Sequence, residues 1–186
     1  MRHLKALQVI LVVAAVAGVQ EVDAQIRGQV HEYAVPAHGK FSLRVPDGWQ
    51  DFSKPMEQPA SVLLRFRPAT GDLFYVQVTS FWLDAAKLAK ATRESLKATV
   101  TKSSEESLRQ AIEKDVVLEE LRGDETHGYY YSLTDRAPRP GEYKYLTQGS
   151  FLTGELMTVF TILYREPVFP EKEMILQMLA DAKYAK

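Results

Sequence analysis

The amino-acid sequence predicts an α+β fold in which a single antiparallel β-sheet, made of two meanders, is flanked by helices. Three observations predict this class. Strand-like runs rich in β-branched and aromatic residues fill both halves of the chain. Amphipathic helical stretches lie between the halves and near the C-terminus. The connections between neighbouring strand-like runs are too short for a parallel crossover, so antiparallel pairing is expected.

The first half contains four strand-like runs, at residues 33–35, 41–45, 62–67 and 73–82. Within the second run Phe41, Leu43 and Val45 share one face, which is the period of a half-buried strand. Before the third run, Pro55 and Pro59 predict a loop. The last two runs are predicted to be antiparallel neighbours, because only a short turn separates them.

Two helices are predicted in the middle of the chain. From Asp84 to Thr99, apolar and small residues recur every three or four positions, which predicts one amphipathic helix with Asp84 as its N-cap. Ser103 and Glu106 then have the spacing of a capping box. This spacing predicts a second, shorter helix that ends before Lys114.

The second half contains strand-like runs at residues 116–121, 128–134, 142–152 and 156–165. Pro167 and Pro170 end the last of these runs, and residues 171–184 are predicted to form a closing helix. No linker of low complexity divides the chain. Residues 25–186 are therefore expected to form a single domain.

The first 24 residues predict a secretory signal peptide. Basic Arg2 and Lys5 precede the apolar block 9–17, which is about half the length needed to cross a bilayer permanently. Small Ala24 precedes Gln25, so cleavage is expected between them and the protein is expected to be secreted or periplasmic. An uncleaved leader that anchors the chain is the alternative. No second long apolar run predicts a membrane span after cleavage.

The composition argues against several classes of protein. The chain has no cysteine, which excludes a thiol nucleophile, disulfide exchange, a thiolate metal site and a lipid on an N-terminal cysteine. Its 23 Lys and Arg residues nearly balance 24 Asp and Glu residues, unlike a protein that coats nucleic acid. It also lacks the glycine-rich phosphate loops and the nucleophile elbow of serine hydrolases, so no cofactor is predicted.

Asp124, Glu125 and His127 are the candidate metal ligands. Two carboxylates and an imidazole close together in the sequence could hold a cation or serve as an acid–base set. The alternative is a solvated turn between two strands, because polar residues gather at turns for backbone reasons.

A binding site is a second candidate, made of Arg136, Arg139, Tyr143 and His127. Two arginines in the proline-rich turn 135–141 could grip a carboxylate or phosphate, although ordinary solubility also explains them. Tyr143 could extend an aromatic platform with Tyr129, Tyr131 and Tyr145. Packing of these tyrosines in the core, against a helix, is the alternative.

The segment Gly39–Trp49 carries a Phe-Ser-apolar-x-x-Pro-x-x-Trp core that resembles the opening of the PsbP/Mog1-like proteins. In that family a strand ends in Pro and a Trp tucks under the sheet. The order of predicted elements from Gln29 to Ala185 is similar as well. The resemblance implies an α/β/α sandwich and a non-enzymatic role, since its members include a photosystem subunit, a GTPase-binding factor and bacterial envelope proteins. None of their partner-contacting residues matches a position here.

These observations together predict an exported, non-enzymatic module that binds another envelope or secreted protein. Two other functions remain open. One is a small enzyme, dependent on a metal or on carboxylates, built around Asp124, Glu125 and His127. The other is a carrier that holds an apolar ligand between the sheet and the helices.

Overall fold

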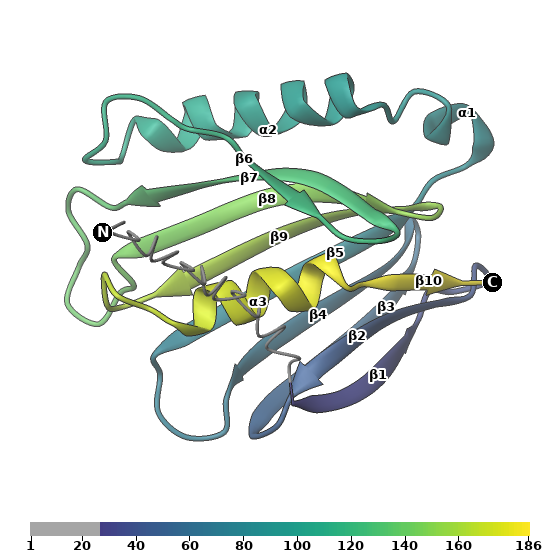
Figure 1. Cartoon of the computed structure of the whole chain (residues 1–186), viewed down its shortest axis with the longest axis horizontal. Helices are drawn as coiled ribbons and strands as arrows, with labels where there is room; N and C mark the ends of the chain where they lie inside the picture. Colours follow the sequence, from purple (N-terminus) through teal and green to yellow (C-terminus); the bar gives the residue numbers. More distant parts are fainter. Residues whose placement is uncertain (1–26) are drawn as a thin grey trace, which may run out of the picture.

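The computed structural model describes residues 27–186 and contains ten strands and three helices within that range (Figure 1). The elements in order are β1 (Gly28–Ala34), β2 (Lys40–Pro46), β3 (Trp49–Glu57), β4 (Ala60–Pro68), β5 (Phe74–Trp82), α1 (Ala85–Leu88), α2 (Arg93–Leu108), β6 (Glu119–Arg122), β7 (Thr126–Thr134), β8 (Tyr145–Thr153), β9 (Leu156–Tyr164), α3 (Glu171–Ala180) and β10 (Lys183–Ala185). The expected signal peptide and its cleavage site lie outside the described residues.

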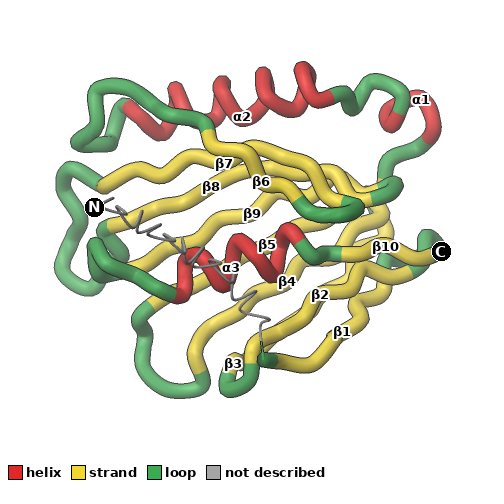
Figure 2. Tube along the Cα trace, in the orientation of Figure 1, coloured by secondary structure: helices red, strands yellow, loops and turns green. Residues whose placement is uncertain are grey.

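The strands form two antiparallel sheets, so the prediction of a single sheet is wrong. A seven-stranded sheet has the order β3-β4-β5-β9-β8-β7-β6, and a three-stranded sheet has the order β1-β2-β10 (Figure 2). The chain leaves β2 through a turn at Gly48, where φ is +80°, and enters β3 in the other sheet. The apolar face of β2 is thereby buried against the large sheet, while its two edges pair with β1 and β10.

The main core lies between these two sheets and α3. Phe41 and Leu43 of β2 are buried in the same cluster as Phe66 of β4, Phe160 of β9 and Met178 of α3. On the opposite face of the large sheet, α2 packs against β7 and β8. The result is a three-layer α+β arrangement with helices on both faces of the large sheet, as expected of an α/β/α sandwich, in which the small sheet shares one outer layer with α3.

The helix predicted from Asp84 to Thr99 is interrupted. Asp84 caps α1 as expected, but the helix ends at Leu88, and a new one starts after Thr92. Thr92 accepts a hydrogen bond from the Ser95 backbone N–H at 3.2 Å, and Ser95 Oγ accepts one from the Thr92 N–H at 3.0 Å. This reciprocal cap begins a new helix. Ser103 lies inside α2, so the second helix predicted from Ser103 does not exist.

Two segments predicted as loop or helix are strands. Residues 49–57 form β3 despite Pro55, because an edge strand tolerates a residue that lacks a backbone N–H. The closing helix ends at Ala180 rather than continuing to Tyr184. The chain after it pairs with β2 as β10, a long-range contact that helical periodicity does not report.

Tyr131 fastens α2 to the large sheet. Its ring is fully buried, and its hydroxyl donates to Gln148 Oε1 at 2.7 Å. The same hydroxyl lies 3.2 Å from Ser103 Oγ and 3.0 Å from Ser107 Oγ on α2. A polar side chain at this depth is accommodated because every polar atom of the group has a partner. Among residues 27–186, no helix is long and apolar enough to cross a membrane.

We expect Tyr131→Phe to destabilise the protein by about 1–2 kcal/mol, because Gln148 and the two serines lose a buried hydrogen-bond partner. Urea unfolding followed by circular dichroism measures the change. The matched control is Tyr129→Phe, since no hydrogen bond involves the Tyr129 hydroxyl in the described part of the chain, and it should shift stability by less than about 0.5 kcal/mol. Equal effects of the two substitutions would contradict this role of the Tyr131 hydroxyl.

Candidate functional site

On the face of the large sheet that carries α2, the helix covers β7 and β8 and leaves about half of the face uncovered. The strand registers form one row of directly opposite residues across the sheet. The row starts at Tyr131, beneath α2, and continues through Gln148, Thr161, Gln77, Arg65 and Phe52. This row shows that β3, β4, β5 and β9 continue the face on which α2 sits. Figure 1 shows α2 along the β6–β8 end of the sheet, away from β3 and β4.

We call this part of the sheet the open face. It consists of Gln50, Phe52, Lys54 and Met56 of β3, Ser61, Leu63, Arg65 and Arg67 of β4, Tyr75, Gln77, Thr79 and Phe81 of β5, and Val159, Thr161 and Leu163 of β9. Most of these side chains are half-buried or exposed, although no side chain of β5 or β9 on this face is charged. Met157 of β9 has the same parity but packs in the cluster that contains Leu96 of α2.

The open face combines apolar and cationic side chains. The Phe52 ring is 52% exposed, and the Arg65 guanidinium carbon lies 5.8 Å from its centroid. Lys54 and Arg67 add two further cations, and none of the open-face residues carries a carboxylate. The acidic residues of β3 have the opposite parity and lie on the other side of the sheet. Such a surface is complementary to one that is acidic and partly apolar.

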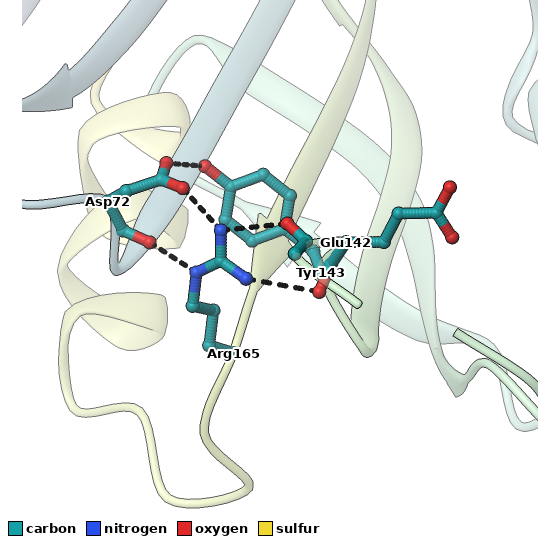
Figure 3. Close-up of polar contacts among 5 residues, drawn as sticks. Asp72, Glu142, Tyr143 and Arg165 are labelled. Atoms are coloured by element: carbon teal, nitrogen blue, oxygen red, sulfur yellow. Dashed lines mark hydrogen bonds and ion pairs between the residues drawn. The ribbon is translucent and has the colours of Figure 1, made fainter. Parts of the chain in front are cut away.

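At one end of the open face, Arg165 joins three loops, in a cluster that we call the Arg165 clamp (Figure 3). Arg165 Nε donates to the Asp72 carbonyl oxygen at 2.7 Å, and Nη2 donates to the Asp72 carboxylate. Nη1 donates to the Glu142 carbonyl oxygen at 3.1 Å, and Nη2 also donates to the Gly141 carbonyl oxygen at 3.0 Å. The planar fork of the guanidinium suits this set of acceptors, which a lysine could not reach together.

Tyr143 completes the clamp. Its hydroxyl donates to the Asp72 carboxylate, and its ring centroid lies 4.6 Å from the guanidinium carbon of Arg165. Hydrogen bonds from Tyr143 and Arg165 hold the pKa of Asp72 below its usual value, and the nearby charge of Arg67 acts in the same direction. Burial and the bond to Asp72 raise the pKa of Tyr143 to about 12. At neutral pH the clamp is therefore a closed set of satisfied charges beside the open face.

The two arginines of the expected binding site are placed differently. Arg136 donates from Nε and Nη2 to the Ala111 carbonyl oxygen, at 3.1 and 2.8 Å, and so ties the β7–β8 loop to the segment after α2. The Arg139 backbone N–H donates to Glu142 Oε2 at 2.9 Å, and its side chain is exposed. Arg136 and Tyr143 thus hold loops in place, whereas Arg139 projects from the same loop.

Asp124, Glu125 and His127 are not brought together. His127 lies on the α2 side of β7, opposite Leu152, where partial burial and then the charge of Arg93 lower its pKa. Asp124 and Glu125 lie at the β6–β7 turn and line a groove beside α3, on the other side of the sheet. Within residues 27–186, no three His, Asp or Glu side chains gather in a way that could hold a metal ion.

The expected platform of four tyrosines does not form. Tyr129 and Tyr131 lie on the α2 side of β7, whereas Tyr145 stacks on Tyr164 at 5.4 Å on the other side of the sheet. Tyr143 lies outside the strands, in the clamp. The strand parity of β7 and β8 separates these rings. Core packing, the other use considered from the sequence, is confirmed: Tyr131 is buried, and Tyr129 and Tyr145 pack against core clusters.

Sequence reasoning missed both the open face and the clamp. Pro55 is typical of a loop and hides the strand that carries Phe52 and Lys54, although residues 50–56 alternate weakly. Arg165 has its carboxylate partner 93 residues away, and no local pattern marks such a contact.

We expect Arg165→Lys to loosen the clamp, since one ammonium group cannot bond to Asp72, Gly141 and Glu142 at once. Hydrogen–deuterium exchange should become faster in residues 69–73 and 139–144, with little change in the core strands. The matched control is Arg139→Lys, whose exposed side chain projects from the β7–β8 loop and makes no clamp contact. Unchanged exchange in both loops would show that the clamp does not hold them.

We expect His127 to make stability depend on pH. Its folded-state pKa is lowered, so the unfolded chain takes up the proton first and the free energy of unfolding falls as the pH drops below about 6.5. His127→Gln should flatten the stability curve in this range, measured by urea unfolding between pH 5 and 7.5. Parallel curves for the two proteins would refute the assignment.

Comparison with known proteins yields structural likeness only. No family model matches the chain, and no curated protein sequence matches it. A crystal structure of a protein from Bacteroides thetaiotaomicron is similar over 87% of this chain and 50% of its own, with 15% identity and a TM-score of 0.54. The chain thus spans half the length of that protein.

The solution structure of cyanobacterial PsbP (CyanoP) from Synechocystis sp. PCC 6803 is similar over 85% of this chain and 94% of its own. The sequence identity is 11% and the TM-score is 0.52. At such identity the likeness concerns the fold and not the function. The chain therefore has a PsbP-like fold.

Proposed function

We propose that this chain is an exported, non-catalytic binding module that attaches through its open face to an acidic, partly apolar surface of another exported or envelope protein. The observation that carries the proposal is the charge of this face, where Lys54, Arg65 and Arg67 lie around the exposed Phe52 ring, beside half-buried apolar side chains, and no carboxylate is present. An apolar centre with charges around it is the usual make-up of a protein-binding patch.

The size of the open face suits a protein partner. Four strands about 4.8 Å apart, with nine residues rising about 3.3 Å each, span about 30 Å by about 15 Å. This is the scale of one side of a small protein–protein interface. The strands are paired along their length, so the surface is rigid before binding and loses little conformational entropy on contact.

The Arg165 clamp supports the same function, because it holds two loops next to the open face. Loops at the end of a sheet are usually its most mobile parts. Here the β4–β5 and β7–β8 loops are held beside the open face by Arg165. A partner would therefore meet a preformed border next to Arg67 and Tyr75.

Export and the absence of catalysis have sequence support. The basic and apolar pattern of residues 1–24 is typical of a secretory leader, and the resemblance of Gly39–Trp49 to the PsbP/Mog1-like proteins favours a binding or assembly role. The fold alone does not assign a partner.

Site-specific photocrosslinking tests the proposal. A photoreactive phenylalanine analogue replaces Phe52 on the open face or Val117, which is 77% exposed in the segment after α2. In extracts of the native envelope, we expect discrete crosslinked proteins from position 52 and not from position 117. Lys54→Glu with Arg65→Glu should reduce those products at least tenfold, because like charges then face each other.

The matched control for charge is Lys114→Glu, which reverses an exposed cation outside the open face. It should leave the crosslinks unchanged. The proposal fails if positions 52 and 117 give the same products, if position 52 gives none, or if the double reversal has no effect.

A further inference from the structure

A groove of about 1040 Å³ is lined by residues of α3 and of the small sheet, on the side of the molecule opposite the open face. Leu43, Ala180 and Ala182 contribute to its lining. Two exposed apolar side chains border it, Val30 of β1 and Met174 of α3, at 55% and 39% exposure. The groove belongs neither to the open face nor to the clamp.

One edge of β2 is open along this groove. β1 pairs with β2 over its whole length, from Lys40 to Pro46. β10 pairs with the other edge only from Lys40 to Ser42. From Leu43 to Pro46, therefore, no strand in the described part of the chain covers that edge, and residues of α3 line the groove beside it. Figure 1 shows β10 following directly from the end of α3.

The register identifies the backbone groups on this edge. The Asp47 N–H donates to the Arg27 carbonyl oxygen at 3.2 Å, next to the pair formed by Gly28 and Pro46. Because hydrogen-bonding residues alternate in an antiparallel pair, the odd-numbered residues of β2 face β1. The N–H and C=O of Arg44 then point the other way, into the groove. A strand edge of this kind is a template for an added strand.

The two sides of the groove differ in charge, because Arg27 and Arg44 line it on the side of the small sheet and carboxylates line it on the side of α3. The α3 side carries Glu171, Glu173 and Asp181, and Asp124 and Glu125 of the β6–β7 turn extend it. Among residues 27–186, Glu171 and Glu173 form no ion pair, whereas Glu125 Oε1 lies 3.9 Å from Lys183 Nζ. A ligand that lies along β2 would therefore present its outer side to a row of carboxylates.

We infer that this groove binds an extended segment of a partner protein, in which basic and apolar residues alternate, as an added strand on β2. The segment continues the line of β10, antiparallel to β2, and exchanges backbone hydrogen bonds with Arg44. Its lysines or arginines lie on the solvent side, near Glu173 and Asp181, and its apolar residues lie on the side of Leu43, Ala180 and Ala182. Main-chain bonds supply affinity and the alternate side chains supply specificity. The inference rests on the proposed binding role of the protein but not on the open face.

A synthetic peptide tests this inference. The probe is acetyl-Lys-Val-Lys-Val-Lys-Val-amide, titrated against the chain that begins at Gln25 and against the full chain. Isothermal titration calorimetry should show saturable binding that weakens with salt. Hydrogen–deuterium exchange at the Arg44 amide should slow at least tenfold in the complex. The same peptide with alternate backbone nitrogens methylated should bind at least tenfold more weakly, because it cannot pair with β2.

Matched variants test the charge. Glu171→Lys with Glu173→Lys should weaken peptide binding at least tenfold. Glu57→Lys with Glu105→Lys, which reverses two exposed carboxylates away from the groove, should leave it unchanged. Lys54→Glu with Arg65→Glu should also leave it unchanged, so a failure of the open face and a failure of the groove are told apart.

Three outcomes overturn the inference. If the methylated peptide binds as well as the parent peptide, the ligand does not add as a strand. If an acidic analogue with Glu in place of Lys binds equally well, the carboxylates of α3 do not select the ligand. If the peptide binds only to the chain lacking residues 1–24, the occupant of the groove is this chain's own N-terminal segment and not a partner.

Discussion

Burial of one face of the seven-stranded sheet beneath the small sheet and α3 is the interaction on which the rest of the structure depends. The aromatic and aliphatic side chains of β2, such as Phe41 and Leu43, fill the space above Phe66 and Phe160, and α3 adds Met178 to the same cluster. This packing fixes where β1, β2 and β10 lie and removes most apolar area from water on that side. The other face receives only α2, which covers β7 and β8.

Unequal covering of the two faces produces two surfaces of different chemistry. The open face offers side chains, with cations around an apolar centre, and suits a partner of complementary shape and charge. The groove beside α3 instead offers the backbone of β2 at Arg44, next to carboxylates. Because the two surfaces lie on opposite sides of the large sheet, one molecule could engage both without steric conflict.

Arg136 and Tyr143, which the sequence predicted as binding residues, hold loops beside those surfaces in place. Arg136 bonds to the Ala111 carbonyl oxygen, and Tyr143 bonds to Asp72 beneath Arg165. Their hydrogen-bonding groups are used within the molecule, so they are less available to a ligand than their residue types suggest. Arg139 is exposed, and its side chain takes no part in the Arg165 clamp.

The sequence by itself determined the α+β class, the alternating faces of β2 and the strand nature of β4, β5, β7 and β9, because side-chain periodicity directly reports which side of an element is buried. It also predicted where α3 begins. The second sheet, β3 with its Pro55, β10, the interruption before α2 and the partners of Arg165 were decided only by the tertiary structure. Periodicity does not report which strands pair. That choice depends on contacts between residues far apart in the chain, such as Asp72 with Arg165 and Ser42 with Lys183, and on the burial they achieve together.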